Sequence, residues 1–147
     1  MKRNEILDRL RAEQEKIIEN LKNQVERYRV ASDIDEDSTV DPEDLSRQAE
    51  AKDMQLRFEK LLNYAQREMA FLDEELSKTH QEIEDGTLIL TDRKYFFVGV
   101  SVPVFDFEGT PVMSFSYGAP VFAKFKGKKP GDKVEVGEES YTIKEIC

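Results

Sequence analysis

Two long segments with helical spacing of apolar residues constrain the fold of this chain more than any other feature. From Asn4 to about Ala31 apolar residues recur every three or four positions, with no Gly or Pro between them. These apolar positions are Ile6, Leu7, Leu10, Ile17, Ile18, Leu21, Val25 and Tyr28. A narrow apolar stripe between charged flanks is typical of a coiled-coil seam and needs a partner helix. We therefore expect a second helix to pack against this one.

The second segment supplies that partner. It begins at Asp41, which is suited to cap a helix, with Pro42 at the first helical position and acids in the first turn. Its apolar positions are Leu45, Ala49, Phe58, Leu61, Leu62, Ala65, Met69, Leu72, Leu76 and Ile83. We expect this helix to end near Gly86. The two segments together predict an antiparallel coiled-coil hairpin over residues 1–85.

An acidic stretch separates the two helices and forms the expected tip at residues 31–44. Seven of the twelve residues from 33 to 44 are acids, and no Lys or Arg interrupts them. They are Asp33, Asp35, Glu36, Asp37, Asp41, Glu43 and Asp44. Residues 86–147 carry eight acids and eight bases, so the whole net charge of −9 lies in the first 85 residues. This distribution opposes binding to nucleic acid through a general basic surface.

The pattern changes from helix to strand after Gly86. Short β-rich runs at residues 88–90, 95–104 and 111–117 are separated by turn residues. A helical turn is expected within residues 119–126, and a β-hairpin across residues 137–139. The sequence thus predicts an α+β protein with a small β-rich domain at 86–147, which packs on the base of the hairpin.

Composition excludes several kinds of site. The single Cys147 cannot form an internal disulfide, which favours the cytoplasm. One His and one Cys supply neither a zinc site nor an imidazole-based triad. We expect His80 to be an exposed helix position. We expect no signal peptide, no apolar run is long enough for a membrane span, and a monomer is expected.

Two motifs carry a resemblance to a known family. The first is Gly127–Val136, GKKPGDKVEV, followed by Tyr141–Ile146, YTIKEI, and preceded by Pro120-Val121. The second is Asp44-Leu45 followed by Ala49-Glu50 at the tip. With the overall layout, the chain resembles the Gre-type transcript elongation factors of bacterial RNA polymerase over most of its length.

The resemblance implies an FKBP-like C-terminal domain that docks at the rim of the polymerase secondary channel while the hairpin enters the channel. The tip carboxylates would help to hold a Mg²⁺ ion of the polymerase active site, since Mg²⁺ prefers carboxylate and water oxygens. The candidate residues are Asp33, Asp35, Glu36, Asp37, Asp41 and Asp44. The chain would be an accessory factor and not an enzyme, with no permanently bound cofactor, acting near the 3′ end of the nascent RNA.

One position departs from the family pattern. Arg47 stands where cleavage-stimulating members carry a second acid, three residues after the first. The tip is closer to relatives that inhibit the polymerase, so stimulation and inhibition both stay open. Arg27 and Arg29 are candidates for contact with RNA phosphate or for pairing with acids across the hairpin. Candidates for polymerase docking are Lys124, Lys126, Lys128 and Lys129, which could equally form a solubilising surface.

Other interpretations of the same residues stay open. Helix capping alone can explain Asp41, Glu43 and Asp44, and the remaining tip acids can belong to a solvated loop. Asp33, Asp35 and Asp37 partly match a calcium-binding loop, but Ser38 stands at the position that needs Gly. At the level of the whole chain, the alternatives are a coiled-coil interaction module without a polymerase role, or a prolyl isomerase.

Overall fold

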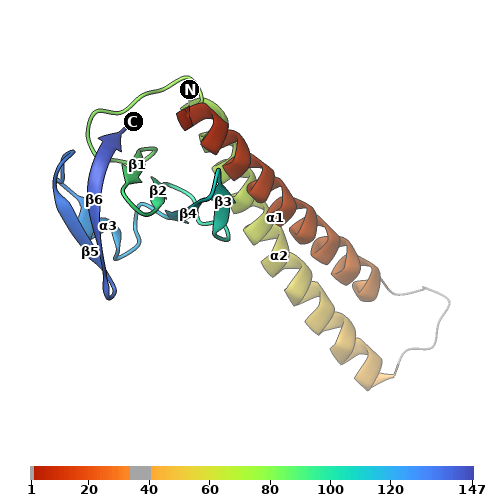
Figure 1. Ribbon diagram of the computed structural model, residues 1–147. Helices are drawn as coiled ribbons and strands as arrows, with labels where there is room; N and C mark the ends of the chain where they lie inside the picture. Colours follow the sequence, from red (N-terminus) through yellow and green to blue (C-terminus); the bar gives the residue numbers. More distant parts are fainter. Residues whose placement is uncertain (1, 34–40) are drawn as a thin grey trace. The chain divides into compact units, whose positions relative to one another are not determined.

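A computed structural model describes residues 2–33 and 41–147, and it shows an α+β protein with two long helices and one mixed sheet (Figure 1). The chain divides into two compact units. We call residues up to Glu13 together with Ala70–Cys147 the sheet unit, and Gln14–Met69 the hairpin unit. These bounds differ from the predicted division at residue 85, because the first turns of one helix and the last turns of the other pack within the sheet unit.

The hairpin unit contains the greater part of both helices. Helix α1 spans Lys2–Ser32 and helix α2 spans Pro42–Glu75. They are antiparallel, because Gln14 contacts Ala65 whereas Tyr28, further along α1, stacks on Phe58. The predicted hairpin is therefore confirmed, and so is the helix start: Asp41 Oδ1 accepts a hydrogen bond of 2.8 Å from the Asp44 backbone N–H.

The sheet unit is built on six strands in the order β3-β4-β2-β1-β6-β5. Their bounds are β1 Leu88–Thr91, β2 Tyr95–Val98, β3 Phe105–Phe107, β4 Thr110–Phe115, β5 Lys133–Val136 and β6 Glu139–Ile146, with the short helix α3 at Phe122–Phe125 before β5. Strands β2 and β4 are parallel and the other pairs are antiparallel.

Both faces of the sheet are buried. On one face Phe96 packs against Phe125 and Tyr141, with ring centroids 4.9 and 5.2 Å apart. On the other face Phe97 contacts Phe71, near the end of α2, at 6.5 Å. Two buried faces explain why β1 and β2 read as continuous apolar runs without alternation.

Helix α2 ends at Glu75 and not near Gly86 as the apolar spacing predicts. Ile83, which fits the helical pattern, instead lies in the core of the sheet unit with 7% of its surface exposed. The β-rich run from Tyr95 also ends early, at Val98, because Gly99 has a φ of +140°. The turn expected at residues 106–110 is a two-residue connection, with Glu108 and Gly109 both at positive φ.

Candidate functional site: the hairpin end and a pocket beside the sheet

The described end of the hairpin unit is asymmetric. Helix α1 ends at Ser32, whose hydroxyl lies 3.4 Å from Oε1 of Gln55 on α2. Helix α2 begins at Pro42, so its first three to four turns, roughly 20 Å, precede Gln55. Side chains there are largely exposed, including Leu45 at 51%. This segment presents the start of α2 to solvent.

The acidic residues at this end differ in the hydrogen bonds and ion pairs that their carboxylates make. Asp33 lies 3.4 Å from Arg29, and Glu43 pairs with Arg47 one turn away at 3.1 Å. Asp41 is occupied through one oxygen as the helix cap. Asp44 is exposed, and its carboxylate makes no hydrogen bond or ion pair with any residue that the structure describes. Of the described tip acids, Asp44 is the one whose carboxylate is available to a partner.

The remaining tip candidates, Asp35, Glu36 and Asp37, lie outside the described residues. Within residues 2–33 and 41–147, no three His, Cys, Asp or Glu side chains are arranged to hold a metal ion. Likewise, no helix among those described is both long and apolar enough to cross a membrane.

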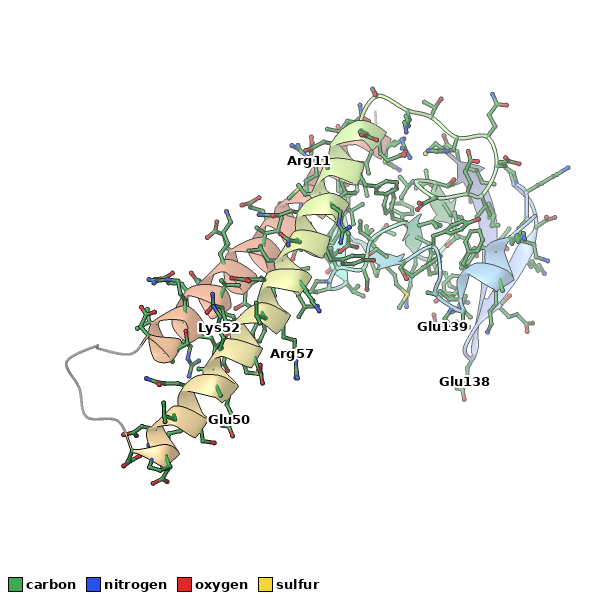
Figure 2. All side chains as sticks on the ribbon, turned by 180° about the vertical axis from the view of Figure 1, so that it is seen from behind. Arg11, Glu50, Lys52, Arg57, Glu138 and Glu139 are labelled. Carbon is green, nitrogen blue, oxygen red and sulfur yellow. The ribbon has the colours of Figure 1, made fainter. Side chains whose placement is uncertain are left out.

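Among residues 2–33 and 41–147, the two arginines near the end of α1 make no ion pair across the hairpin. Arg29 binds Glu26, one turn earlier on the same helix, at 2.6 Å, and the exposed Arg27 has no such contact among the described residues. The hydrogen bond lowers the pKa of Glu26 and raises that of Arg29. The expectation of pairing across the hairpin is wrong for Arg29, because its own helix supplies acids at closer range. Figure 2 labels other exposed charges of α2: Glu50, Lys52 and Arg57.

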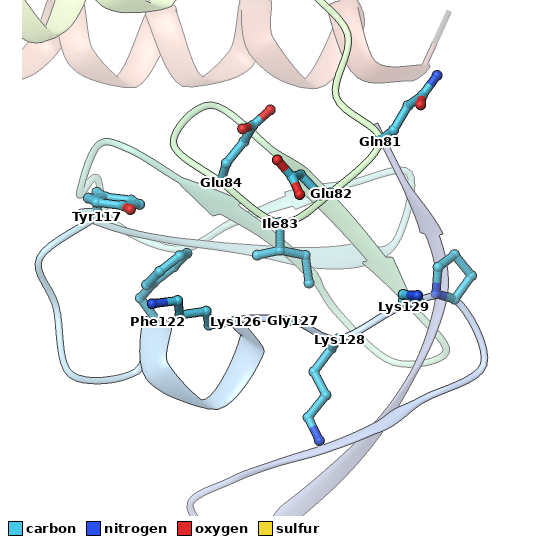
Figure 3. A pocket seen from close by; sticks show the side chains of 11 residues that line it. Gln81, Glu82, Ile83, Glu84, Tyr117, Phe122, Lys126, Gly127, Lys128 and Lys129 are labelled. Atoms are coloured by element: carbon cyan, nitrogen blue, oxygen red, sulfur yellow. The ribbon is translucent and has the colours of Figure 1, made fainter.

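The sheet unit contains a pocket of about 530 Å³. Its lining residues are Gln81, Glu82, Ile83, Glu84, Tyr117, Phe122, Lys126, Gly127, Lys128, Lys129 and Pro130. Figure 3 shows Glu82 and Glu84 on one side and Lys126 and Lys128 on the other, with Ile83 between them. The pocket thus combines an apolar floor with walls of opposite charge, which suits a protein surface that carries both an apolar side chain and charges.

Three of the four predicted docking lysines, Lys126, Lys128 and Lys129, line this pocket. Lys124 lies instead in a second, more polar groove, together with Lys128 and Lys133. Sequence reasoning missed the acidic wall at residues 81–84, because it assigned that segment to the end of a helix. It also missed Tyr117, which is 51% exposed beside Phe122 at a ring distance of 4.6 Å.

A buried charge cluster fixes the segment that leads to the pocket. The guanidinium of Arg3 donates to Glu75 Oε2 at 2.9 Å and to the backbone carbonyls of Glu75, Lys78, Gly86 and Cys147. Arg3 and Glu75 are each 2% exposed. His80, expected to be exposed, lies between Glu75 and Glu84 with 9% of its side chain exposed, so that expectation is wrong.

Comparison with models of protein families, with curated proteins and with solved structures gives no match for this chain.

Proposed function

We propose that this chain binds bacterial RNA polymerase at its secondary channel and acts on the polymerase active site through the hairpin end, as a Gre-type factor does. The observation that carries the proposal is the exposed carboxylate of Asp44, which has no partner among the described residues, on the turns of α2 that precede Gln55. The resemblance of the tip and C-terminal motifs supplies the identity of the partner.

The residues support a division of roles within the chain. The pocket with its Lys126, Lys128 and Lys129 wall is the docking site in this proposal, and the sheet unit is the FKBP-like domain that the resemblance implies. Asp44 is the residue that approaches the Mg²⁺ ion of the polymerase. Because Mg²⁺ keeps several waters and takes few protein carboxylates, one unpaired carboxylate is a sufficient contribution from this chain.

Arg47 bears on the direction of the effect. Its guanidinium neutralises Glu43, so the first turns of α2 present less negative charge than their acids suggest. A cation one turn after Asp44 also disfavours a second close metal ion. We therefore propose inhibition of the polymerase as the main effect of this chain, with stimulation of transcript cleavage as the opposite outcome of the same assay.

The test uses purified core RNA polymerase. The proposal expects the chain to be retained on immobilised core enzyme and to be displaced by an authentic Gre factor. Transcript extension and transcript cleavage are then measured on stalled complexes with wild type, Asp44→Ala and Asp53→Ala. Asp53 is an exposed acid about 13 Å further along α2, so it controls for loss of charge. No retention on the polymerase would contradict the proposal, as would equal effects of the two variants.

A second candidate function is a coiled-coil interaction module. Five large apolar side chains of the hairpin unit are exposed by 47% or more: Val30, Leu45, Leu56, Leu61 and Tyr64. Single exposed apolar residues are common, but a second helix could cover several of these. Light scattering distinguishes the two functions, because the interaction module predicts a stable dimer and the polymerase factor predicts a monomer.

A further inference from the structure

The only histidine of the chain has an unusual environment. His80 Nε2 lies 2.7 Å from Glu75 Oε2, and Nδ1 lies 2.7 Å from Glu84 Oε1. The side chain of His80 is nearly buried, and that of Glu75 more so. Both ring nitrogens therefore face carboxylate oxygens at hydrogen-bond distance.

This geometry depends on the protonation of the ring. An ionised carboxylate only accepts hydrogen bonds, and a neutral imidazole has a single N–H to donate. Only the imidazolium form can donate to Glu75 and Glu84 at once. Loss of the proton leaves one ring nitrogen with its lone pair directed at a carboxylate oxygen, so one of the two contacts must break.

The surrounding charges decide which contact breaks. The charged groups near the ring are Arg3 from α1, Glu75 at the end of α2, and Lys78, Glu84 and Asp85 from the following segment. With an imidazolium they contain three cations and three acids. Glu75 is held by Arg3 whether or not His80 is charged. Glu84 has no second cationic partner among the described residues and is 46% exposed, so Glu84 is the contact that is lost.

Glu84 also belongs to the pocket wall. The backbone there is held independently of His80: the Glu84 N–H donates to Thr87 Oγ1 at 2.9 Å, and the Thr87 hydroxyl donates to the Glu82 carbonyl at 2.8 Å. Thr87 is fully buried. Figure 3 shows the Glu84 carboxylate on the side of the pocket away from Lys126 and Lys128. His80 therefore controls the position of one side chain and leaves the backbone of the wall in place.

We propose that His80 is a proton-dependent switch, which holds the Glu84 carboxylate when the ring is charged and releases it toward the pocket when the ring is neutral. The released carboxylate adds a mobile negative charge opposite the lysine wall. A partner bound in the pocket would then have different affinities for the chain with a charged and with a neutral His80 ring. This last consequence rests on the proposed function, whereas the switch itself is a property of the sheet unit.

The switch can be observed without any partner. Because the chain has one histidine, ring signals of a ¹⁵N-histidine-labelled protein belong to His80 without assignment. The full chain is titrated from pH 6 to pH 9 while the side-chain carboxyl carbon of Glu84 is followed by NMR; its signal is identified by its absence in Glu84→Gln. We expect both ring nitrogens to carry protected protons while the ring is charged. As the ring becomes neutral, the Glu84 carboxyl signal shifts along the same titration curve.

Two comparisons make the result decisive. Glu82→Gln removes the other acid of the wall, which has no bond to His80, and should leave the coupled titration unchanged. His80→Gln should hold the Glu84 signal at its high-pH position throughout the range. A charged ring that protects only one of its two nitrogen protons, or a Glu84 signal that does not follow the ring, would overturn the switch. The titration of the wild-type chain separates these outcomes even if a variant does not fold, and binding to polymerase plays no part in it.

Discussion

The sheet unit and the hairpin unit differ in whether their buried polar groups have hydrogen-bond partners. In the sheet unit, the buried guanidinium of Arg3 has a hydrogen-bond partner for each of its nitrogens. In the hairpin unit, Gln14 is 1% exposed, yet its Oε1 has no hydrogen-bond partner in the described part of the chain. The sheet unit has a core of aromatic side chains with many hydrogen bonds. The hairpin unit has a narrow contact between two helices and much exposed surface. The pocket lies in the sheet unit, and the exposed carboxylate of Asp44 lies in the hairpin unit.

The largest effect should come from Arg3. Arg3→Met leaves Glu75 buried without its main cationic partner and frees four backbone carbonyls from their donor. We expect the free energy of unfolding of the sheet unit to fall by about 3–5 kcal/mol. Urea denaturation followed by tyrosine fluorescence, which Tyr95 and Tyr141 supply from the sheet, measures this loss.

Arg11→Met is the matched control. Arg11 pairs with Asp73 at 2.7 Å, but the two side chains are 39% and 50% exposed. An exposed pair contributes about 0–1 kcal/mol. If the two arginine variants unfolded at the same urea concentration, the view of the sheet unit as the unit with satisfied buried charge would be wrong.

A gain in stability is expected in the hairpin unit. Gln14→Leu keeps the approximate size of the side chain and removes a buried oxygen without a partner, so we expect the hairpin to become more stable by about 1 kcal/mol. Gln55→Leu is the comparison, because both amide atoms of Gln55 have partners, Ser32 and Glu59. In thermal unfolding followed by circular dichroism, we expect Tm to be raised for Gln14→Leu and not for Gln55→Leu. A lower Tm for Gln14→Leu would show that its hydrogen bonds to Ala65 and Glu68 outweigh the unsatisfied oxygen.

The helix cap at Asp41 should have a local effect of similar size. Asp41→Ala removes the acceptor for the Asp44 N–H and is expected to cost about 1 kcal/mol in the first turn of α2. Asp41→Asn keeps an acceptor oxygen and serves as the control. Hydrogen exchange of the backbone amides at the start of α2 reports the change, and faster exchange in both variants alike would contradict a capping role.

The smallest effect concerns pH. Burial raises the pKa of Glu68, and a hydrogen bond from Gln14 opposes this rise. The folded chain therefore holds the Glu68 proton more tightly than the unfolded chain does, so ionisation at neutral pH costs stability. Because the side chain is only half-buried, we expect Glu68→Gln to gain no more than about 0.5 kcal/mol at pH 7 and nothing at pH 3. An equal gain at both pH values would point to packing instead of charge.

Local signals were sufficient for much of this fold. The apolar spacing gave both helices, the run Asp41-Pro42 gave the start of α2, and Gly137 marked the β5–β6 turn. Each of these features depends on residues close together in the sequence.

Long-range contacts explain what could not be predicted. The role of Arg3 depends on residues 72 to 144 positions away, and no local pattern indicates it. Ile83 satisfies the helical spacing as well as the needs of the sheet core, so its true place depends on tertiary packing. Because α2 ends at Glu75 and not near Gly86, His80 is buried and the following residues form the acidic wall of the pocket. The sequence therefore predicted the lysines of the pocket and not its acidic wall.

The central claim is that docking and action on the polymerase belong to different units, and one measurement tests it directly. Equilibrium binding to core RNA polymerase and inhibition of transcript extension are measured side by side for Lys128→Glu and for Asp44→Ala. The account predicts that Lys128→Glu weakens binding at least tenfold, about 1.4 kcal/mol, whereas Asp44→Ala binds as wild type does but loses its effect on extension. Loss of binding in Asp44→Ala together with unchanged binding in Lys128→Glu would contradict it.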